Sequence, residues 1–166
     1  GNTTNVLNML AEHPYCKAAD DSINSYVNNK TDVKASDTVK SENEKRLVSL
    51  FKRVHSAFPE YVEVYLGTKW GGYATNFDGF MSAGYDPRKR GWYISATENH
   101  GKRIITNAYL STVGDVVVCL SKSVDSPSNE HIGNVSIEVT LNQLTDMISK
   151  FKIGKTGHVM LVQGDN

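Results

Sequence analysis

The stretch Gly133–Leu141 reads GNVSIEVTL, and it decides the class of fold because apolar and polar residues alternate along it. In an extended strand one face would carry Val135, Ile137, Val139 and Leu141, and the other Ser136, Glu138 and Thr140. Such a strand buries one face in a core, while its other face meets water or lines a binding site. The stretch therefore predicts a half-buried strand of an antiparallel sheet.

Similar stretches surround this strand. Further strands are predicted over residues 61–66, 73–76, 103–110, 116–124 and 158–162. The gaps at Gly114-Asp115 and at residues 125–129 carry the residues typical of hairpin connections. Helical spacing of apolar residues predicts helices over 4–27, 42–57, 92–98 and 141–151, with a kink or a restart at His13-Pro14. The predicted fold is α+β, with an antiparallel sheet of about five strands and flanking helices.

Alternation also assigns the polar face of the neighbouring strands. Asn107, Tyr109 and Ser111 should share one face of strand 103–110, with Ile104 and Thr106 on the other. Cys119, Ser121 and Ser123 should share a face of strand 116–124. These polar faces either meet water or line a small-molecule site, and the large Tyr109 on such a face favours the site.

The loop that could cover this face is Tyr85-Asp86-Pro87-Arg88-Lys89-Arg90-Gly91-Trp92-Tyr93. Pro87 fixes its own φ and favours an extended Asp86, so the segment should turn into a short ordered element. The guanidinium of Arg90 matches a carboxylate, and Trp92 and Tyr93 each join a flat apolar body to one polar group. The alternative is a surface turn with two aromatic residues in the core. A loop rich in aromatics over a polar sheet face favours a concave site for a small anionic or zwitterionic molecule.

Composition excludes several functions. The 166 residues hold 18 Lys and Arg against 18 Asp and Glu, without the dense basic patch of a nucleic-acid-binding surface. No apolar run approaches the roughly twenty residues that span a bilayer. Cys16 and Cys119 fall on separate predicted elements without metal-ligand spacing, so two buried or partly buried thiols are the expectation, with a single disulfide as the alternative. The histidines are scattered, and neither a His-Glu-x-x-His nor a Gly-x-Ser-x-Gly motif is present, so we expect no catalysis, no metal and no cofactor.

In several of these motifs the chain resembles the double Cache ligand-binding domains of bacterial chemoreceptors (methyl-accepting chemotaxis proteins) and sensor kinases. Four stretches carry the resemblance, in the order Gly84–Tyr93, Asn107–Tyr109, Gly133–Leu141 and Ile153–Val159. The resemblance implies a long N-terminal helix followed by a PAS-like, membrane-distal module and then a membrane-proximal module. It divides the chain into a helical region at 1–57, the distal ligand-binding module at 58–152, and the start of a truncated proximal module at 153–166.

The resemblance also implies a ligand site. In amino-acid-binding members an Arg and a Trp that match Arg90 and Trp92 hold the ligand carboxylate, and tyrosines that match Tyr85 and Tyr109 line the pocket beside Tyr93. Two Asp residues hold the ligand ammonium in those members. This chain has Ser111 and Glu138 at the matching positions, so a charge is lost at the first and a methylene is gained at the second.

The function expected is that of an extracytoplasmic sensor domain that binds an amino acid or a related amine-bearing carboxylate to control chemotaxis. By the same resemblance the parent protein is anchored in the inner membrane, this part is periplasmic, and a homodimer forms through the N-terminal helix. Two alternatives stay open: a sensor domain of a histidine kinase or cyclase that binds an organic acid or other small molecule, and a dimerisation module without a ligand.

Overall fold

The computed structural model describes residues 2–110, 114–145 and 159–162, and most of its strands form one twisted sheet. Among the described residues this sheet has seven strands: six follow the order β3-β2-β8-β7-β5-β9, and the seventh, β6, pairs with β7. Their bounds are Glu63–Thr68 (β2), Tyr73–Thr75 (β3), Arg103–Thr106 (β5), Tyr109–Leu110 (β6), Val116–Asp125 (β7), His131–Thr140 (β8) and Val159–Val162 (β9). The predicted α+β class is confirmed. All neighbours pair antiparallel except β5 and β9, which run parallel.

Helices and short elements complete the described chain. The helices are α1 (Asn2–Glu12), α2 (Pro14–Lys17), α3 (Glu42–Ala57) and α4 (Gly91–Glu98), and residues 141–145 are helical as well. Strands β1 (Val33–Lys34) and β4 (Phe80–Met81) form a separate ribbon, and the 3-10 turn η1 (Ala35–Asp37) follows β1 directly. A second 3-10 turn, η2 (Pro87–Lys89), contacts α4 and β2.

The N-terminal helix restarts at the predicted proline. Helix α1 ends at Glu12, and α2 begins at Pro14 with His13 as its N-cap, whose side chain accepts a hydrogen bond from the Tyr15 N–H. Proline has no N–H to donate and suits the first helical position, so it starts a new helix instead of continuing the old one. The prediction of a helix as far as residue 27 was wrong beyond Lys17, where the chain continues in turns.

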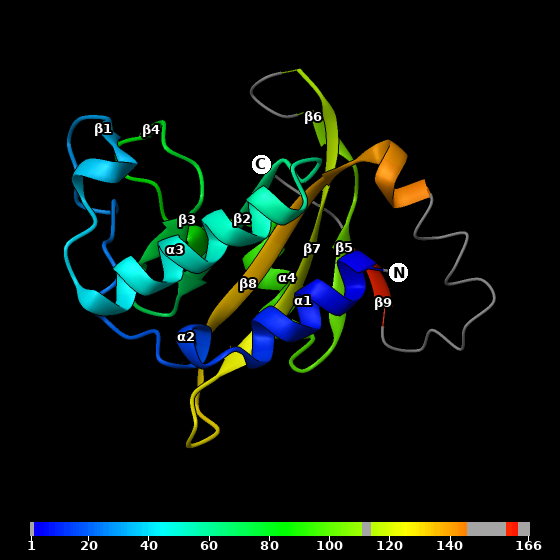
Figure 1. Ribbon diagram of the computed structural model, residues 1–166, viewed down its shortest axis with the longest axis horizontal. Coiled ribbons are helices and arrows are strands. Elements are labelled where there is room, and N and C mark those ends of the chain that lie inside the picture. Colours follow the sequence, from blue (N-terminus) through cyan, green and yellow to red (C-terminus); the bar gives the residue numbers. More distant parts are fainter. Residues whose placement is uncertain (1, 111–113, 146–158, 163–166) are drawn as a thin grey trace.

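The sheet separates two clusters of buried side chains. Helices α1 and α3 lie across one face (Figure 1), where Leu7, Leu10 and Phe51 pack on the apolar side chains of β2, β7 and β8. Val135, Ile137 and Val139 are all on this face, as the alternation predicted. The opposite face carries a second cluster that includes Tyr65, Tyr73 and Trp92, covered by η2 and α4.

The predicted strand 103–110 is interrupted. β5 ends at Thr106 and β6 begins at Tyr109, so Asn107 and Ala108 lie between two strands. Ile105 lies opposite Leu120 and Tyr109 lies opposite Val117, so four steps along the interrupted strand match three steps along β7, and alternation is reset. The prediction that Thr106 and Tyr109 occupy opposite faces was wrong for this reason. Ser111 lies outside the described residues.

Glu44 is a buried carboxylate in the first turn of α3. Its side chain is almost fully buried and accepts a 2.7 Å hydrogen bond from the Asn24 N–H, while Ser41 caps the helix by accepting from the Glu44 N–H. Burial raises the pKa of Glu44 from 4.5 to about 7, and the hydrogen bond from Asn24 lowers it in part. The folded state therefore binds more protons than the unfolded state between these two values.

We expect the free energy of unfolding to decrease as pH rises from 4.5 to 7, and Glu44 to contribute about 2 kcal/mol to that decrease. Glu44→Gln keeps an acceptor for the Asn24 N–H but cannot ionise, so urea unfolding of this variant should vary less with pH than that of the parent chain. Glu42→Gln, two residues away on an exposed side chain, is the matched control. Equal pH profiles for the Glu44 variant and the parent would contradict the prediction.

Candidate functional site

The loop predicted to cover the sheet is held by its own ion pair. Asp86 is extended, as expected before proline, and its carboxylate accepts from the Arg88 N–H at 3.0 Å and from Arg88 Nε at 2.9 Å. Pro87 opens the 3-10 turn η2, and α4 follows one residue earlier than the predicted Trp92. Arg88 is thus fixed in the turn, which leaves Arg90 for another role.

A glycine lets this loop approach the sheet. A Cβ at Gly67 of β2 would lie 2.7 Å from Pro87 Cβ and 3.0 Å from Cη2 of Trp92. Real side chains do not approach so closely, so η2 and the Trp92 ring could not rest on a β2 strand that had a side chain here. Gly67 therefore sets the depth at which the loop lies on the sheet.

Five aromatic side chains form what we call the aromatic cluster: Tyr65, Tyr73, Tyr85, Trp92 and Tyr93. Edge-to-face contacts join Tyr65 to Trp92 and Tyr73 to Tyr85, with ring centroids 4.9 Å apart in both pairs. This geometry is favourable for aromatic pairs. The predicted residues Tyr85, Trp92 and Tyr93 are therefore brought together on the face that the alternation marked as polar.

Arg90 lies at the entrance to α4, where its carbonyl accepts from the Tyr93 and Ile94 N–H groups. Its guanidinium carbon lies 4.8 Å from the centroid of the Tyr85 ring, a cation–π contact. Among the described residues no carboxylate forms an ion pair with Arg90, in contrast to Arg88. Its hydrogen-bonding edge can therefore bind an anion.

Trp92 and Tyr93 are more buried than a ligand-contacting residue needs to be. Trp92 is 2 % exposed. Burial raises the pKa of Tyr85, and the charge of Arg90 and a hydrogen bond from the Trp92 side chain each lower it in part. Burial raises the pKa of Tyr93 to about 12, and this side chain lies near the charges of Arg88 and Asp86. The arrangement suits both residues to positioning Tyr85 and Arg90.

A chain of polar contacts crosses the sheet below the cluster. Cys119 Sγ lies 2.8 Å from the Tyr65 hydroxyl and 2.9 Å from the Tyr109 hydroxyl, and Tyr109 donates a short hydrogen bond to Glu138 Oε2. Since each hydroxyl has one proton, Tyr109 accepts from the Cys119 thiol and Tyr65 donates to the sulfur. Burial raises the pKa of the Cys119 thiol to about 12, so it stays protonated. Cys16 and Cys119 are both free, as predicted.

The sequence analysis missed three residues of the site face, which are Tyr65, Tyr73 and Glu63. Glu63 is the charged one. It is the direct cross-strand partner of Glu138, and its Oε2 accepts from the hydroxyls of Tyr73, at 2.8 Å, and Thr75. Burial raises the pKa of Glu63 to about 7, and the charge of Glu138 adds to the increase. The alternation of residues 61–66 held the signal, because Glu63 and Tyr65 fall on one face and Val64 and Leu66 on the other.

The residues of the site differ in how much of their surface is exposed. Tyr65, Tyr73 and Trp92 are buried, whereas five polar side chains keep part of their surface open: Glu63, Tyr85, Arg90, Tyr109 and Glu138. The accessible groups therefore combine one cation, two carboxylates and two phenols. Within the described residues no group of three potential metal ligands occurs.

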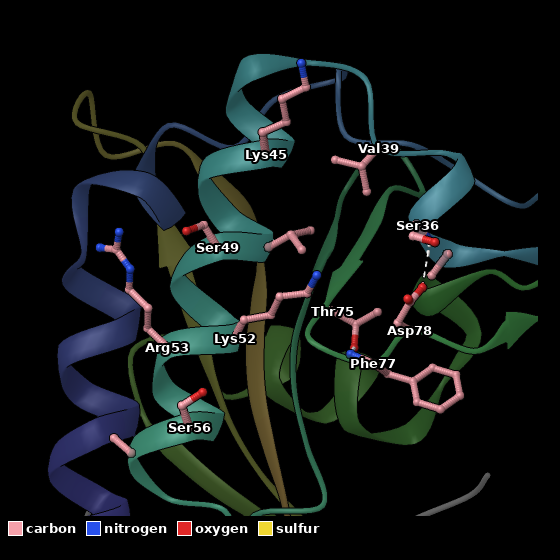
Figure 2. Close-up of a pocket in the computed structure, with 13 residues that line it drawn as sticks. Ser36, Val39, Lys45, Ser49, Lys52, Arg53, Ser56, Thr75, Phe77 and Asp78 are labelled. Atoms are coloured by element: carbon pink, nitrogen blue, oxygen red, sulfur yellow. Dashed lines mark hydrogen bonds between the residues drawn. The ribbon is translucent and has the colours of Figure 1, made fainter.

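A hollow of about 780 Å³ lies beside this site, between α3 and the segments around Ser36 and Phe77 (Figure 2). Lys45, Lys52 and Arg53 of α3 line it, opposite Asp78, whose carboxylate accepts from the Ser36 N–H. Thr75 lines the hollow and donates to Glu63, so the hollow and the site adjoin at β3. The predicted residues of the loop are not part of its lining.

Comparison with known proteins shows which sequences the chain is similar to. No protein-family model matches the chain. Over 106 residues, 63% of this chain, it is 37% identical to the methyl-accepting chemotaxis protein McpA of Pseudomonas putida, of which it spans 16%. Its homologues are methyl-accepting chemotaxis proteins, which agrees with the expectation of a receptor rather than an enzyme.

Solved structures show which fold the chain shares. The ligand-binding domain of the Pseudomonas aeruginosa amino acid chemoreceptor PctC, in complex with GABA, covers 89% of this chain with a TM-score of 0.62 at 20% identity, and 58% of that domain is matched. The ligand-binding domain of the Pseudomonas fluorescens chemoreceptor CtaA, in complex with L-leucine, covers 89% of this chain with a TM-score of 0.61 at 17% identity, and 53% of that domain is matched. The chain thus has the fold of chemoreceptor ligand-binding domains, as the Cache resemblance implied.

Proposed function

We propose that this chain is the ligand-binding part of a chemoreceptor and that it binds a small amino-acid-like carboxylate on the face formed by Arg90, Glu138 and the aromatic cluster. The observation that carries the proposal is the placement of Arg90. It lies over the Tyr85 ring without an ion-pair partner among the described residues, on the same face as two partly exposed carboxylates.

The chemistry of the site suits such a ligand. A guanidinium binds a carboxylate through two parallel hydrogen bonds, and Glu138 offers an acceptor for an ammonium. The aromatic cluster provides apolar walls between the two charged ends. Structures of similar fold hold GABA and L-leucine, which supports an amino-acid-like ligand here.

The wider setting is part of the same proposal. The homologues are chemoreceptors, and we infer that this part of the parent protein is periplasmic and that the parent is a homodimer. Among the described residues no helix is long and apolar enough to cross a membrane. Because Leu7 and Leu10 pack on the sheet, a dimer through α1 would use the opposite side, where Met9 is 44 % exposed. We also propose the domain boundaries after residues 57 and 152, which separate the helical region, the distal ligand-binding module and the start of the proximal module.

A thermal-shift screen of the 166-residue chain tests the function. Ligands that bind only the folded state raise its melting temperature, and a ligand at 100 times its Kd stabilises by about 2.7 kcal/mol. The screen should contain amino acids, amines without a carboxylate and organic acids without an amine. A shift from amino acids is expected. A shift from organic acids alone would favour the organic-acid sensor, and no shift at all would favour the dimerisation module.

A further inference from the structure

Two glutamates stand directly opposite each other on the site face. Glu63 of β2 and Glu138 of β8 are register partners, and the Cβ atoms of such pairs are roughly 4.5–5.5 Å apart. Both side chains point to the face of the aromatic cluster, because Glu63 accepts from Tyr73 and Glu138 accepts from Tyr109. Like charges on directly opposed residues of paired strands repel each other unless a cation or a shared proton lies between them.

The protein supplies no cation to this pair within its described residues. Neither glutamate forms an ion pair there, and the hydrogen bonds described for each use its Oε2 atom. Both residues remain partly exposed, and because these hydrogen bonds use Oε2, Oε1 of each is the atom left for a ligand. The donors that hold the two Oε2 atoms, Tyr73 and Thr75 on one side and Tyr109 on the other, fix the carboxylates in place.

We propose that Glu63 is a specificity-determining residue that makes the site prefer ligands with a second cationic group, such as the diamino acid lysine, over amino acids with neutral side chains. This inference rests on the proposed function, because it takes Arg90 as the group that binds the ligand carboxylate. The charges then match: Arg90 faces the carboxylate, and Glu63 and Glu138 face two cationic groups.

An amino acid with a neutral side chain satisfies this site only in part. Its single ammonium can offset one carboxylate, and the other must then bind water or take up a proton. The second amine of lysine replaces that proton. The tyrosine rings beside Glu63, which are Tyr65, Tyr73 and Tyr85, can pack against the methylene stem and attract the terminal cation.

Isothermal titration of the chain with L-lysine and L-norleucine tests the inference, since norleucine has the same straight four-carbon chain but no amine at its end. We expect lysine to bind at least 10-fold more tightly. Glu63→Gln keeps an acceptor for Tyr73 and Thr75 but removes the charge, and it should weaken lysine at least 10-fold while norleucine changes less than 3-fold. Glu60→Gln, an exposed residue with the same change of charge, should alter neither.

Three results would overturn the inference: norleucine binding as tightly as lysine, equal losses for both ligands in Glu63→Gln, or no binding of lysine at all. The proposed function fails separately. If Arg90→Ala leaves the binding of both ligands unchanged, the carboxylate site itself is elsewhere. If other amino acids bind through Arg90 and lysine does not, only the role of Glu63 is lost. A melting curve of Glu63→Gln verifies that the variant is folded.

Discussion

Replacing Arg90 by alanine should weaken the binding of a carboxylate-bearing ligand by about 30- to 150-fold, equivalent to roughly 2–3 kcal/mol. Among the described residues Arg90 is the cation of the site face, and no carboxylate of the protein pairs with it. Its loss would leave the ligand carboxylate without a charged donor. Titration calorimetry with the best ligand from the thermal-shift screen measures the effect.

Lys89→Ala is the matched control, because it removes the same charge from the neighbouring, exposed residue. It should change affinity by less than 3-fold. The unliganded Arg90 variant should melt close to the parent chain, since the guanidinium takes part in no ion pair among the described residues and its backbone contacts are kept. An affinity loss of the same size in both variants would show that general electrostatic attraction, rather than a contact by Arg90, drives binding.

Gly67→Ala should lower the free energy of unfolding by about 1–3 kcal/mol and weaken ligand binding at the same time. The added methyl would press on Pro87 and on the Trp92 ring, so the loop must move away from β2. Because Arg90 lies between Pro87 and Trp92 in the chain, its guanidinium would move with them. Chemical denaturation and titration of the same variant measure the two effects.

Gly101→Ala separates the loop displacement from a general effect of alanine. Gly101 has a positive φ, so alanine is strained there, but nothing lies within 4 Å of its added Cβ. This variant should lose stability of the order of 1 kcal/mol and keep its ligand affinity. If Gly67→Ala also keeps full affinity, then Gly67 does not determine the position of Arg90.

Much of the fold could be read from the sequence because period-2 alternation is a strong local signal. The partition of Val135, Ile137 and Val139 to one face and Glu138 to the other follows from that period alone. The N-cap of α3, Ser41, precedes a helix whose predicted bounds, 42–57, match the structure. Local patterns of this kind require no knowledge of how strands pair.

What the sequence could not show depends on pairing. The reset of alternation at Asn107–Ala108 follows from how β5 and β6 both pair with β7, and neither residue is one that predicts such an interruption. In the sequence Glu63 is one polar residue in a predicted strand, and only the β2–β8 register shows that it lies opposite Glu138. Likewise, the approach of Pro87 to Gly67 is a contact between segments about twenty residues apart, which composition cannot reveal.

The backbone of Asn24 connects the two faces of the sheet. Its carbonyl accepts from the Tyr73 N–H, and its own N–H donates to the buried Glu44 at the start of α3. Tyr73 belongs to the aromatic cluster and α3 to the opposite layer, so two hydrogen bonds link the wall of the site to a helix on the far side. A shift of β3 toward a bound molecule would therefore displace the first turn of α3 or break one of these hydrogen bonds. The backbone of Asn24 thus couples the position of β3 to that of the helix layer.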